Sequence, residues 1–245
     1  RPAMPIKNTD RVLHFLPIAN GAYGTGAGTN GVPVGTNTPV AIDNFRKTST
    51  DFQSTLYKDQ NTGRYTVAIA GSNNSGDWTG ANVALSTANL SKAVGSNAWN
   101  SQMSDAVNFT FAAFRQIRDD YQARGERPPS FDDMRKMVDV TGHSLGGALS
   151  ELVGKFFGIG GANIDGPGVS GLIGVPEYKA LQAQVQKEFP DLKTDYPSDS
   201  TFGSYAYTVV GAAGTHISGI EKQQTPDAQI AEQALRFGIT TGNTI

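Results

Sequence analysis

Apolar and polar residues alternate along several short segments of the chain and recur at helical spacing along others. In the run RYTVAIAG, large apolar residues at positions 65, 67 and 69 alternate with smaller ones, and the preceding run DFQSTLYKD ends at the turn-forming sequence QNTG. This arrangement predicts a β-hairpin. From Met103 to Tyr121, apolar residues recur every three or four positions, which predicts a long amphipathic helix. On similar grounds we expect strands over residues 51–59, 64–71, 137–141, 161–165, 192–199 and 205–211, and helices over 101–124, 147–156, 176–190 and 225–237.

Two stretches lack a clear period. Residues 1–44 are expected to form a loop-rich N-terminal segment, because a short apolar run from Val12 to Leu16 is followed by a tract of glycine, threonine and asparagine over 20–37. Residues 74–97 place Trp78 and scattered aliphatic residues among small polar ones. This composition fits either a plain loop and helix or a segment that covers a binding site.

The stretch MVDVTGHSLGGAL, residues 137–149, carries the strongest chemical signal. A short β-type run leads into Gly142-His143-Ser144-Leu145-Gly146, and small and apolar residues at helical spacing follow. This is the strand, G-x-S-x-G turn and helix that present a nucleophilic serine above the end of a buried strand. Glycines are expected on both sides of the serine because a Cβ atom there would collide with the neighbouring strand and helix. We therefore expect Ser144 to be a nucleophile.

A serine nucleophile needs a general base, and the chain has three histidines. His143 is adjacent to Ser144, so its ring is expected to point into the scaffold. His14 stands in an apolar stretch far upstream, where packing or exposure is commoner than catalysis. His216 lies in a glycine-rich loop after the last strong strand, in the chain order serine, acid, histidine. His216 is therefore the expected base.

The acid that orients the base remains open between two aspartates. Asp165 ends the strand after the serine unit, and Asp199 ends the next predicted strand. Hydrolases of this type mostly take the acid from the later strand, which favours Asp199 over Asp165. The other carboxylates in this part of the chain are expected to be surface charges: Asp191, Asp195, Glu177 and Glu188.

A second oxyanion donor is expected in the loop that follows an earlier strand. The strand that ends at Ala70 runs into the polar sequence GSNNSGDW, so the backbone N–H of Ser72 is the candidate. An ordinary polar turn is the alternative interpretation of this sequence.

Composition limits the class of partner. A chain of 245 residues can bury a full core, and we expect a single domain over 1–245. The net charge of −2 offers no basic surface for nucleic acid, and no apolar run is long enough to span a membrane. There is no cysteine for disulfides or a thiolate metal site. Because the chain begins at Arg1 and not at methionine, we expect a processed or trimmed chain, from which a signal peptide, a propeptide or neighbouring domains have been removed. We expect the protein to be secreted or exported.

Three sequence motifs resemble those of the class 3 (fungal-type) lipases, and the likeness covers roughly residues 45–221. VTGHSLGGALSELV resembles the serine turn of that family, TVAIAGSNNSGDW resembles its strand and oxyanion loop, and ANIDGPGV resembles the strand and turn that follow in bacterial members. On this resemblance YPSDSTFG occupies the place of the catalytic acid, and GTHISG occupies the place of the catalytic histidine.

The resemblance implies an α/β-hydrolase fold, with a central, mostly parallel sheet flanked by helices. It implies Ser144 as nucleophile, Asp199 as acid and His216 as base, with Ser72 and Leu145 as oxyanion donors and no metal or cofactor. Two positions depart from the family pattern. Ala70 stands where the family usually has an arginine, and Asp199 is followed by Ser-Thr-Phe rather than by x-Val-Pro.

The resemblance further implies a serine carboxylic ester hydrolase of lipase or phospholipase type. Its partners would be a lipid or ester substrate and, transiently, a lipid surface, with residues 74–97 as the lid over the acyl chain. The alternative is a catalytically silent lipid-binding or interaction module that keeps the fold. The intact G-x-S-x-G motif and the histidine after the last strong strand favour the enzyme.

Overall fold

The computed structural model describes residues 8–25, 30–42, 52–70, 99–196, 201–202, 205–210, 221–223 and 228–236. Within these ranges the strands are β1 (Asn37–Val40), β2 (Gln53–Asp59), β3 (Tyr65–Ala70), β4 (Val138–His143), β5 (Gly160–Ile164), β6 (Thr201–Phe202), β7 (Tyr205–Val210) and β8 (Glu221–Gln223). The helices are α1 (Asn8–Gly21), α3 (Ser101–Ala123), α4 (Phe131–Arg135), α5 (Leu145–Phe157), α6 (Pro176–Glu188), α7 (Ala228–Arg236) and the short 3₁₀ helix η2 (Ser170–Leu172).

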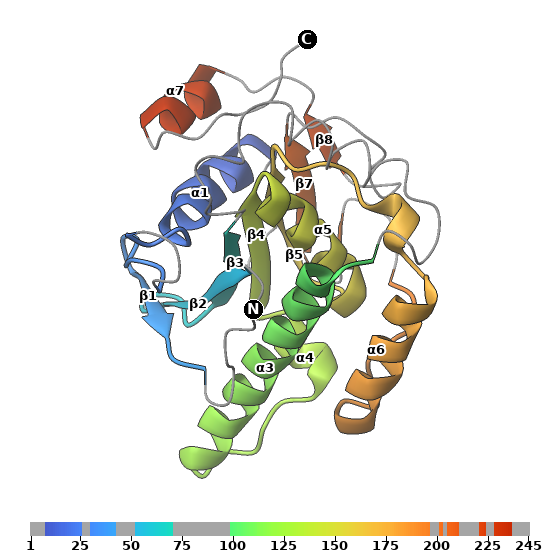
Figure 1. Cartoon of the computed structure of the whole chain (residues 1–245). Helices are drawn as coiled ribbons and strands as arrows, with labels where there is room; N and C mark the ends of the chain where they lie inside the picture. Colours follow the sequence, from blue (N-terminus) through green and yellow to red (C-terminus); the bar gives the residue numbers. More distant parts are fainter. Residues whose placement is uncertain are drawn as a thin grey trace.

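The described strands form one mixed sheet with helices on both faces, so the fold is α/β (Figure 1). Its order is β1-β2-β3-β4-β5-β7-β6, and β8 also pairs with β7. From β3 onward the pairs β3–β4, β4–β5, β5–β7 and β7–β8 are parallel, whereas β1, β2 and β6 pair antiparallel. The predicted hairpin is confirmed as β2 and β3, joined through the turn at residues 60–64.

The parallel strands end level with one another. Register places Ile69, Gly142, Asn163, Val209 and Lys222 in one row across the five strands. The next row contains the last residues of β4, β5, β7 and β8, which are His143, Ile164, Val210 and Gln223. Since carboxyl ends of parallel strands meet at one edge, the residues that follow them start from the same edge of the sheet.

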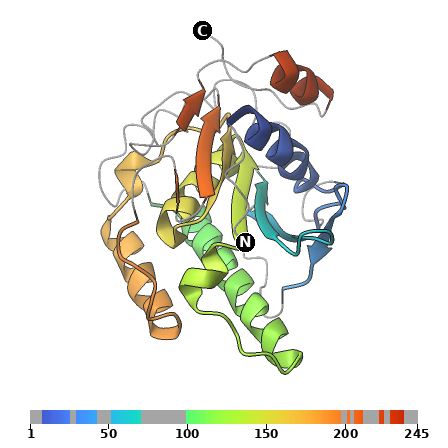
Figure 2. The same ribbon diagram turned by 180° about the vertical axis from the view of Figure 1, so that it is seen from behind.

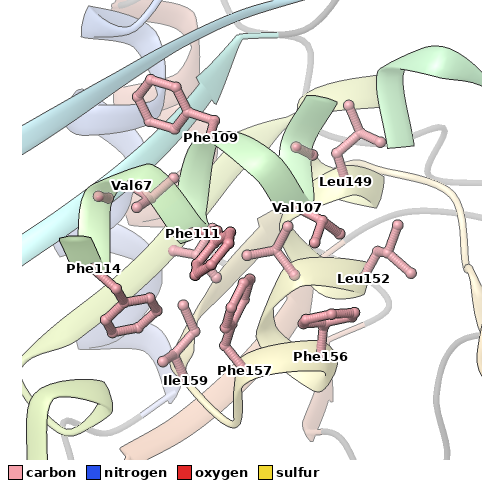
Figure 3. Packing of buried hydrophobic residues seen from close by; sticks show 14 of the residues in the cluster. Val67, Val107, Phe109, Phe111, Phe114, Leu149, Leu152, Phe156, Phe157 and Ile159 are labelled. Carbon is pink, nitrogen blue, oxygen red and sulfur yellow. The ribbon is translucent and has the colours of Figure 1, made fainter. Parts of the chain in front are cut away.

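Helices lie on both sides of the sheet (Figures 1 and 2), and the two faces bury different cores. Val67, Ile69 and Val140 face a large core made with α3, α4, α5 and α6, whereas Ala68 and Ala162 face a smaller core made with α1. The alternation follows from the two-residue period of a strand. Figure 3 shows the large core between α3 and α5, where Phe111, Phe114, Phe156 and Phe157 pack among aliphatic residues.

The predicted helices over 101–124, 147–156 and 176–190 are confirmed as α3, α5 and α6, and α7 falls within the predicted 225–237. Residues 1–44 were predicted to be rich in loops, but the helix α1 occupies Asn8–Gly21. Val12, Phe15, Leu16 and Ala19 have the spacing of one helix face and are buried. Pro17 inside the helix obscured that pattern, since proline usually ends a helix.

The strand predicted over 192–199 is wrong for its described part, because residues 192–196 form an irregular segment. Side chains rather than a strand neighbour satisfy its carbonyl groups. Gln182 Nε2 donates to the carbonyl oxygen of Thr194 at 2.8 Å, and Gln186 Nε2 donates to that of Leu192 at 3.0 Å. Lys155 Nζ donates to the carbonyl oxygen of Tyr196. These bonds fix the segment against α6 and α5 instead of in the sheet.

None of the helices in the described ranges combines the length and the apolar character that crossing a membrane requires.

Candidate active site at the carboxyl edge of the sheet

Ser144 lies between β4 and α5 in a backbone conformation that L-residues seldom adopt. Its φ is 59° and its ψ is −122°, and Asp165 is the other non-glycine residue with positive φ in the described chain. Such a conformation costs about 1–3 kcal/mol and persists only where the surroundings impose it. The Ser144 N–H donates to the Ile164 carbonyl oxygen at 2.9 Å, and its carbonyl oxygen accepts from the Ala148 N–H at 3.0 Å. The strand, strained serine and helix predicted from G-x-S-x-G are therefore all present.

Glycine is required beside the serine because α5 packs directly on the strand ends. A Cβ atom at Gly142 would lie 2.3 Å from the carbonyl oxygen of Gly146 and 2.7 Å from that of Ile69. A Cβ atom at Gly147 would lie 2.3 Å from Asn163 Oδ1. At Gly142 the crowding atoms belong to the backbone, so a Cβ atom there would force backbone movement and the predicted steric role of Gly142 is confirmed. At Gly147 a Cβ atom would instead displace the Asn163 side chain.

The N-terminus of α5 supplies hydrogen-bond donors beside Ser144. Leu145 is the first residue of this 13-residue helix, and the first turn of any helix has N–H groups without intrahelical acceptors. These groups and the helix dipole favour negative charge at that end. Ser144 occupies the N-cap position, yet its side chain makes no capping hydrogen bond with the described chain. The serine is buried, with 5% of its surface accessible.

The His143 ring points away from Ser144's helix and toward the N-terminal segment, as expected for consecutive residues. Its Nδ1 lies 3.1 Å from the Tyr23 hydroxyl, which is also 3.5 Å from the His143 carbonyl oxygen. Register puts His143 on the same face as Ile164, and Ile164 belongs to the core formed with α1. Tyr23, just after α1, therefore contacts the residue that precedes the candidate nucleophile, a contact that sequence analysis did not identify.

His14 lies far from this edge. It is exposed on α1 and packs edge-on against Phe15, with ring centroids 4.8 Å apart. Burial raises the pKa of the Asp139 carboxyl, and the charges of Arg64, His14 and Arg11 partly oppose that rise. Asp139 is the second residue of β4, so His14 and Arg11 lie near the amino-terminal half of that strand. His14 is therefore not placed to act on Ser144.

Among the candidate acids, those expected to be surface charges mostly have structural partners. Asp191 accepts a hydrogen bond from the Asp132 N–H at 3.0 Å, Asp195 pairs with Lys155 at 2.9 Å, and Glu188 pairs with Arg115 at 3.0 Å. Their side chains are exposed or near the surface. Glu177 is instead half-buried in the first turn of α6.

Asp165 is the described acid that lies at the carboxyl edge. It follows Ile164 directly, is half-buried and has a φ of 57°. Its strand, β5, is the immediate neighbour of β4. The structure thus brings Ser144, Leu145 and Asp165 to the same edge of the sheet.

The remaining candidates lie outside the described residues: Ser72, Asp199, His216 and the segment 74–97. Their places in the sequence relate to described strands. Ser72 comes two residues after the end of β3, and His216 comes six residues after the end of β7. Asp199 precedes β6 by two residues.

A buried polar pair beneath the serine turn was not expected from the sequence. Glu151 on α5 and Asn163 on β5 are both fully buried. Asn163 Nδ2 lies 3.5 Å from Glu151 Oε1, and Glu151 Oε2 accepts from the Val169 N–H at 3.1 Å. The only sequence signal is a pair of polar residues at positions that the apolar pattern places in the core.

The described residues contain no group of three or more His, Cys, Asp or Glu side chains that could hold a metal ion. Ser144 and Asp165 both lie at the carboxyl edge of the sheet, where Ser144 precedes the N-terminus of α5. Comparisons of the chain with models of known protein families, with curated proteins and with solved structures found no match.

Proposed function

We propose that this chain is a serine carboxylic ester hydrolase of the α/β-hydrolase type that cleaves acyl esters of lipids. The observation that carries the proposal is the strained backbone of Ser144, at φ 59°, between a parallel strand and the N-terminus of α5. Strain of this kind is maintained at sites where it serves a reaction. A packing role alone does not require serine there, since glycine would adopt the conformation at lower cost.

The sheet supports the proposal because it gives the candidate residues a common starting edge. The serine follows β4, Asp165 follows β5, and the sequence carrying His216 follows β7, whose last residue is level with those of β4 and β5. Active sites of open α/β sheets form outside the carboxyl ends of the strands. The sequence after β7 follows Ser144 in the chain and starts from the same edge of the sheet, as a base for Ser144 requires.

In the proposed reaction His216 takes the proton of the Ser144 hydroxyl as the oxygen attacks the ester carbonyl. The backbone N–H groups of Leu145 and Ser72 bind the resulting oxyanion, and the α5 dipole stabilises its charge. The tetrahedral intermediate expels the alcohol, which receives the proton from His216. Water, deprotonated by His216, then releases the acid and restores the serine. Asp199 orients the histidine, with Asp165 as the alternative.

Hydrolysis of p-nitrophenyl butyrate and p-nitrophenyl palmitate tests this proposal. We expect Ser144→Ala and His216→Ala to lower kcat by about 10⁴-fold or more, because a triad that loses its nucleophile or base retains only oxyanion and binding effects. The acid is the aspartate whose replacement by alanine, in Asp199→Ala or Asp165→Ala, gives the larger loss of kcat. We expect it to be Asp199. A higher kcat/KM on palmitate than on butyrate would favour lipid esters over small soluble ones.

Two variants serve as matched controls. His14 is exposed on α1 and Ser101 is exposed at the start of α3, so His14→Ala and Ser101→Ala should keep wild-type rates. The proposal is rejected if the intact chain hydrolyses neither ester, or if Ser144→Ala keeps full activity. Either result would favour the non-catalytic lipid-binding module.

A further inference from the structure

Beneath the serine turn lies a buried hydrogen-bonded cluster that the proposed reaction does not use. Asn163 and Glu151 have no accessible surface. Asn163 Oδ1 accepts from the Gly166 N–H at 2.8 Å, and its Nδ2 donates to the Gly166 carbonyl oxygen at 3.2 Å. The same Nδ2 lies 3.5 Å from Glu151 Oε1. Asn163 therefore binds both backbone groups of Gly166, and its contact with Glu151 connects them to α5.

Glu151 holds the turn at a second point. Its Oε2 accepts from the Val169 N–H at 3.1 Å, so the buried carboxylate on α5 holds Val169 directly and Gly166 through Asn163. Burying a carboxylate is costly unless hydrogen bonds satisfy it. An aliphatic residue at position 151 would fill the same space without that cost. Here one carboxylate oxygen accepts from the Val169 N–H, and the other faces Asn163 Nδ2.

The clamped turn is in direct contact with the backbone of Ser144. A Cβ atom at Gly166 would lie 2.5 Å from the Ser144 carbonyl oxygen and 2.4 Å from the Ala148 nitrogen, so Gly166 packs against that hydrogen bond. On the other side, the Ser144 N–H donates to Ile164 at 2.9 Å. Residues 164–166 thus touch both peptide groups of the candidate nucleophile, with Asp165 between them. Any shift of this turn would move Ser144.

We propose that Glu151 and Asn163 are positioning residues for acyl transfer, which fix the turn 165–169 and thereby the backbone of Ser144. This inference rests on the proposed function. Neither side chain is placed to touch the substrate, since both lie in the core behind the serine. Displacing reacting groups by a fraction of an ångström slows the chemical step more than it weakens binding. The expected signature of the pair is therefore an effect on kcat with little effect on KM.

Substitutions that exchange hydrogen-bond donors and acceptors at positions 151 and 163 test this inference. In Glu151→Gln, an NH₂ group must face either Asn163 Nδ2 or the Val169 N–H, so two donors meet. In Asn163→Asp, a carboxylate oxygen must face Glu151 and the Gly166 carbonyl oxygen, so acceptors meet. The double variant Glu151→Gln/Asn163→Asp restores a donor–acceptor pair between positions 151 and 163 and the single buried negative charge, whereas a carboxylate oxygen still faces the Gly166 carbonyl oxygen. Only a role in which these two side chains act on each other predicts that the double variant recovers.

The readouts are kcat and KM for p-nitrophenyl butyrate, below the melting temperature of each variant, and hydrogen exchange of peptides covering residues 163–170. We expect each single variant to lower kcat by about 10- to 100-fold, with KM little changed and faster exchange at Gly166 and Val169. The double variant should have a higher kcat and slower exchange than Asn163→Asp, and both should stay below wild type because the carboxylate at position 163 still faces the Gly166 carbonyl oxygen.

The control is Asp139→Asn at the opposite end of β4. Asp139 is also buried and pairs with Arg64 at 2.9 Å, so its loss lowers stability without touching the serine turn. We expect a lower melting temperature and an unchanged kcat. A purely structural role of Glu151 and Asn163 would give them this same pattern, and that result overturns the inference.

The remaining outcomes are also decisive. If a single variant does not fold, a folded double variant supports the pair, and an unfolded one rejects it. If hydrolysis depends on Ser144 but is indifferent to both single variants, the positioning role fails while the proposed function stands. If the wild-type chain shows no hydrolysis, the proposed function itself fails.

Discussion

At the scale of single residues, backbone strain is concentrated at the carboxyl edge of the sheet. The non-glycine residues with positive φ in the described chain are Ser144 and Asp165, which follow adjacent strands. A hydrogen bond of 2.9 Å from the Ser144 N–H to Ile164 joins the two turns. Local preference alone would place glycine at both positions. A serine and a carboxylate at these positions are consistent with the proposed reaction, which needs their side chains.

Gly142 is the residue whose substitution should most directly damage the serine turn. In Gly142→Ala the new Cβ atom would lie 2.3 Å from the Gly146 carbonyl oxygen, which belongs to the backbone of α5 and cannot rotate away. We expect a loss of at least about 1–3 kcal/mol in unfolding free energy, as for an overpacked core, and a large fall in kcat in the folded fraction. Urea denaturation and ester hydrolysis measure the two effects.

Gly125→Ala separates crowding from backbone strain. Gly125 has a φ of 71° after α3 and has open space where a Cβ atom would be, so alanine there costs about 1 kcal/mol of strain alone. We expect Gly125→Ala to lose stability and keep kcat. Equal kcat values for the two variants would show that the close approach of α5 to Gly142 does not matter for the reaction.

At the scale of secondary structure elements, sequence periodicity predicted those elements whose pattern is local. The hairpin β2–β3, the helix α3 and the strand–turn–helix around Ser144 all have strong periods over their own residues. Residues 192–196 show the limit of this reasoning. Their carbonyl groups bond to Gln182, Gln186 and Lys155 from other elements, which no local pattern reveals.

The candidate site likewise combines a residue that a local sequence motif reveals with contacts between residues that are far apart in the sequence. The G-x-S-x-G motif identified Ser144 because its strand, turn and helix are contiguous. The contacts of Tyr23 with His143 and of Glu151 with Asn163 join residues that are 120 and 12 positions apart. A tyrosine in a glycine-rich tract and a glutamate in an apolar helix carry no sequence signal of these partners, because the fold alone brings them together.

The short helix α4 provides a prediction about pH. Partial burial alone would raise the pKa of the Asp132 carboxyl, but hydrogen bonds and charge from Arg135 and Lys136 outweigh it and hold the pKa below its ordinary value. The ion pairs measure 2.8 Å and 3.2 Å. A carboxyl with a depressed pKa stabilises the folded state above its unfolded pKa of about 3.9, and that stability is lost as pH falls through the lower folded pKa.

We therefore expect Asp132→Asn to lower the melting temperature at pH 7, and the difference from wild type to shrink to nothing as pH falls below the folded pKa. Thermal unfolding followed by circular dichroism at pH 7 and at successively lower pH gives the comparison. Asp133→Asn changes the neighbouring carboxylate, which makes no ion pair with the described chain, and should show a smaller difference at pH 7. A difference for Asp132→Asn that persists at the lowest pH would contradict the assignment of its stability to the ionised carboxyl.

At the scale of the whole molecule, the parallel sheet turns distant sequence positions into neighbours. The ends of β4, β5, β7 and β8 lie in one row, and Ile69 near the end of β3 is level with Gly142. Residues more than a hundred positions apart therefore begin their loops from one edge. This arrangement explains why a serine, an acid and a histidine in that chain order are compatible with a single site.

The carboxyl edge of the sheet depends on α1, because α1 packs on one face of the sheet in the smaller core. Leu16 is fully buried in the smaller core, which also contains Ala68 and Ile164, and α1 leads to Tyr23, which contacts His143. Leu16→Ala should lower the unfolding free energy by about 2–5 kcal/mol, because it leaves a cavity between α1 and the sheet. Urea denaturation followed by tryptophan fluorescence measures this loss.

Leu13→Ala, on the half-buried side of the same helix, removes the same number of atoms and should cost clearly less. If α1 serves only as a cover, Leu16→Ala changes stability alone. If α1 also holds Tyr23 against the serine turn, Leu16→Ala lowers kcat in the folded protein as well, and Tyr23→Phe reproduces that loss with little change in stability. Equal stability losses for Leu13→Ala and Leu16→Ala would show that the smaller core does not depend on α1 in the way the burial of Leu16 indicates.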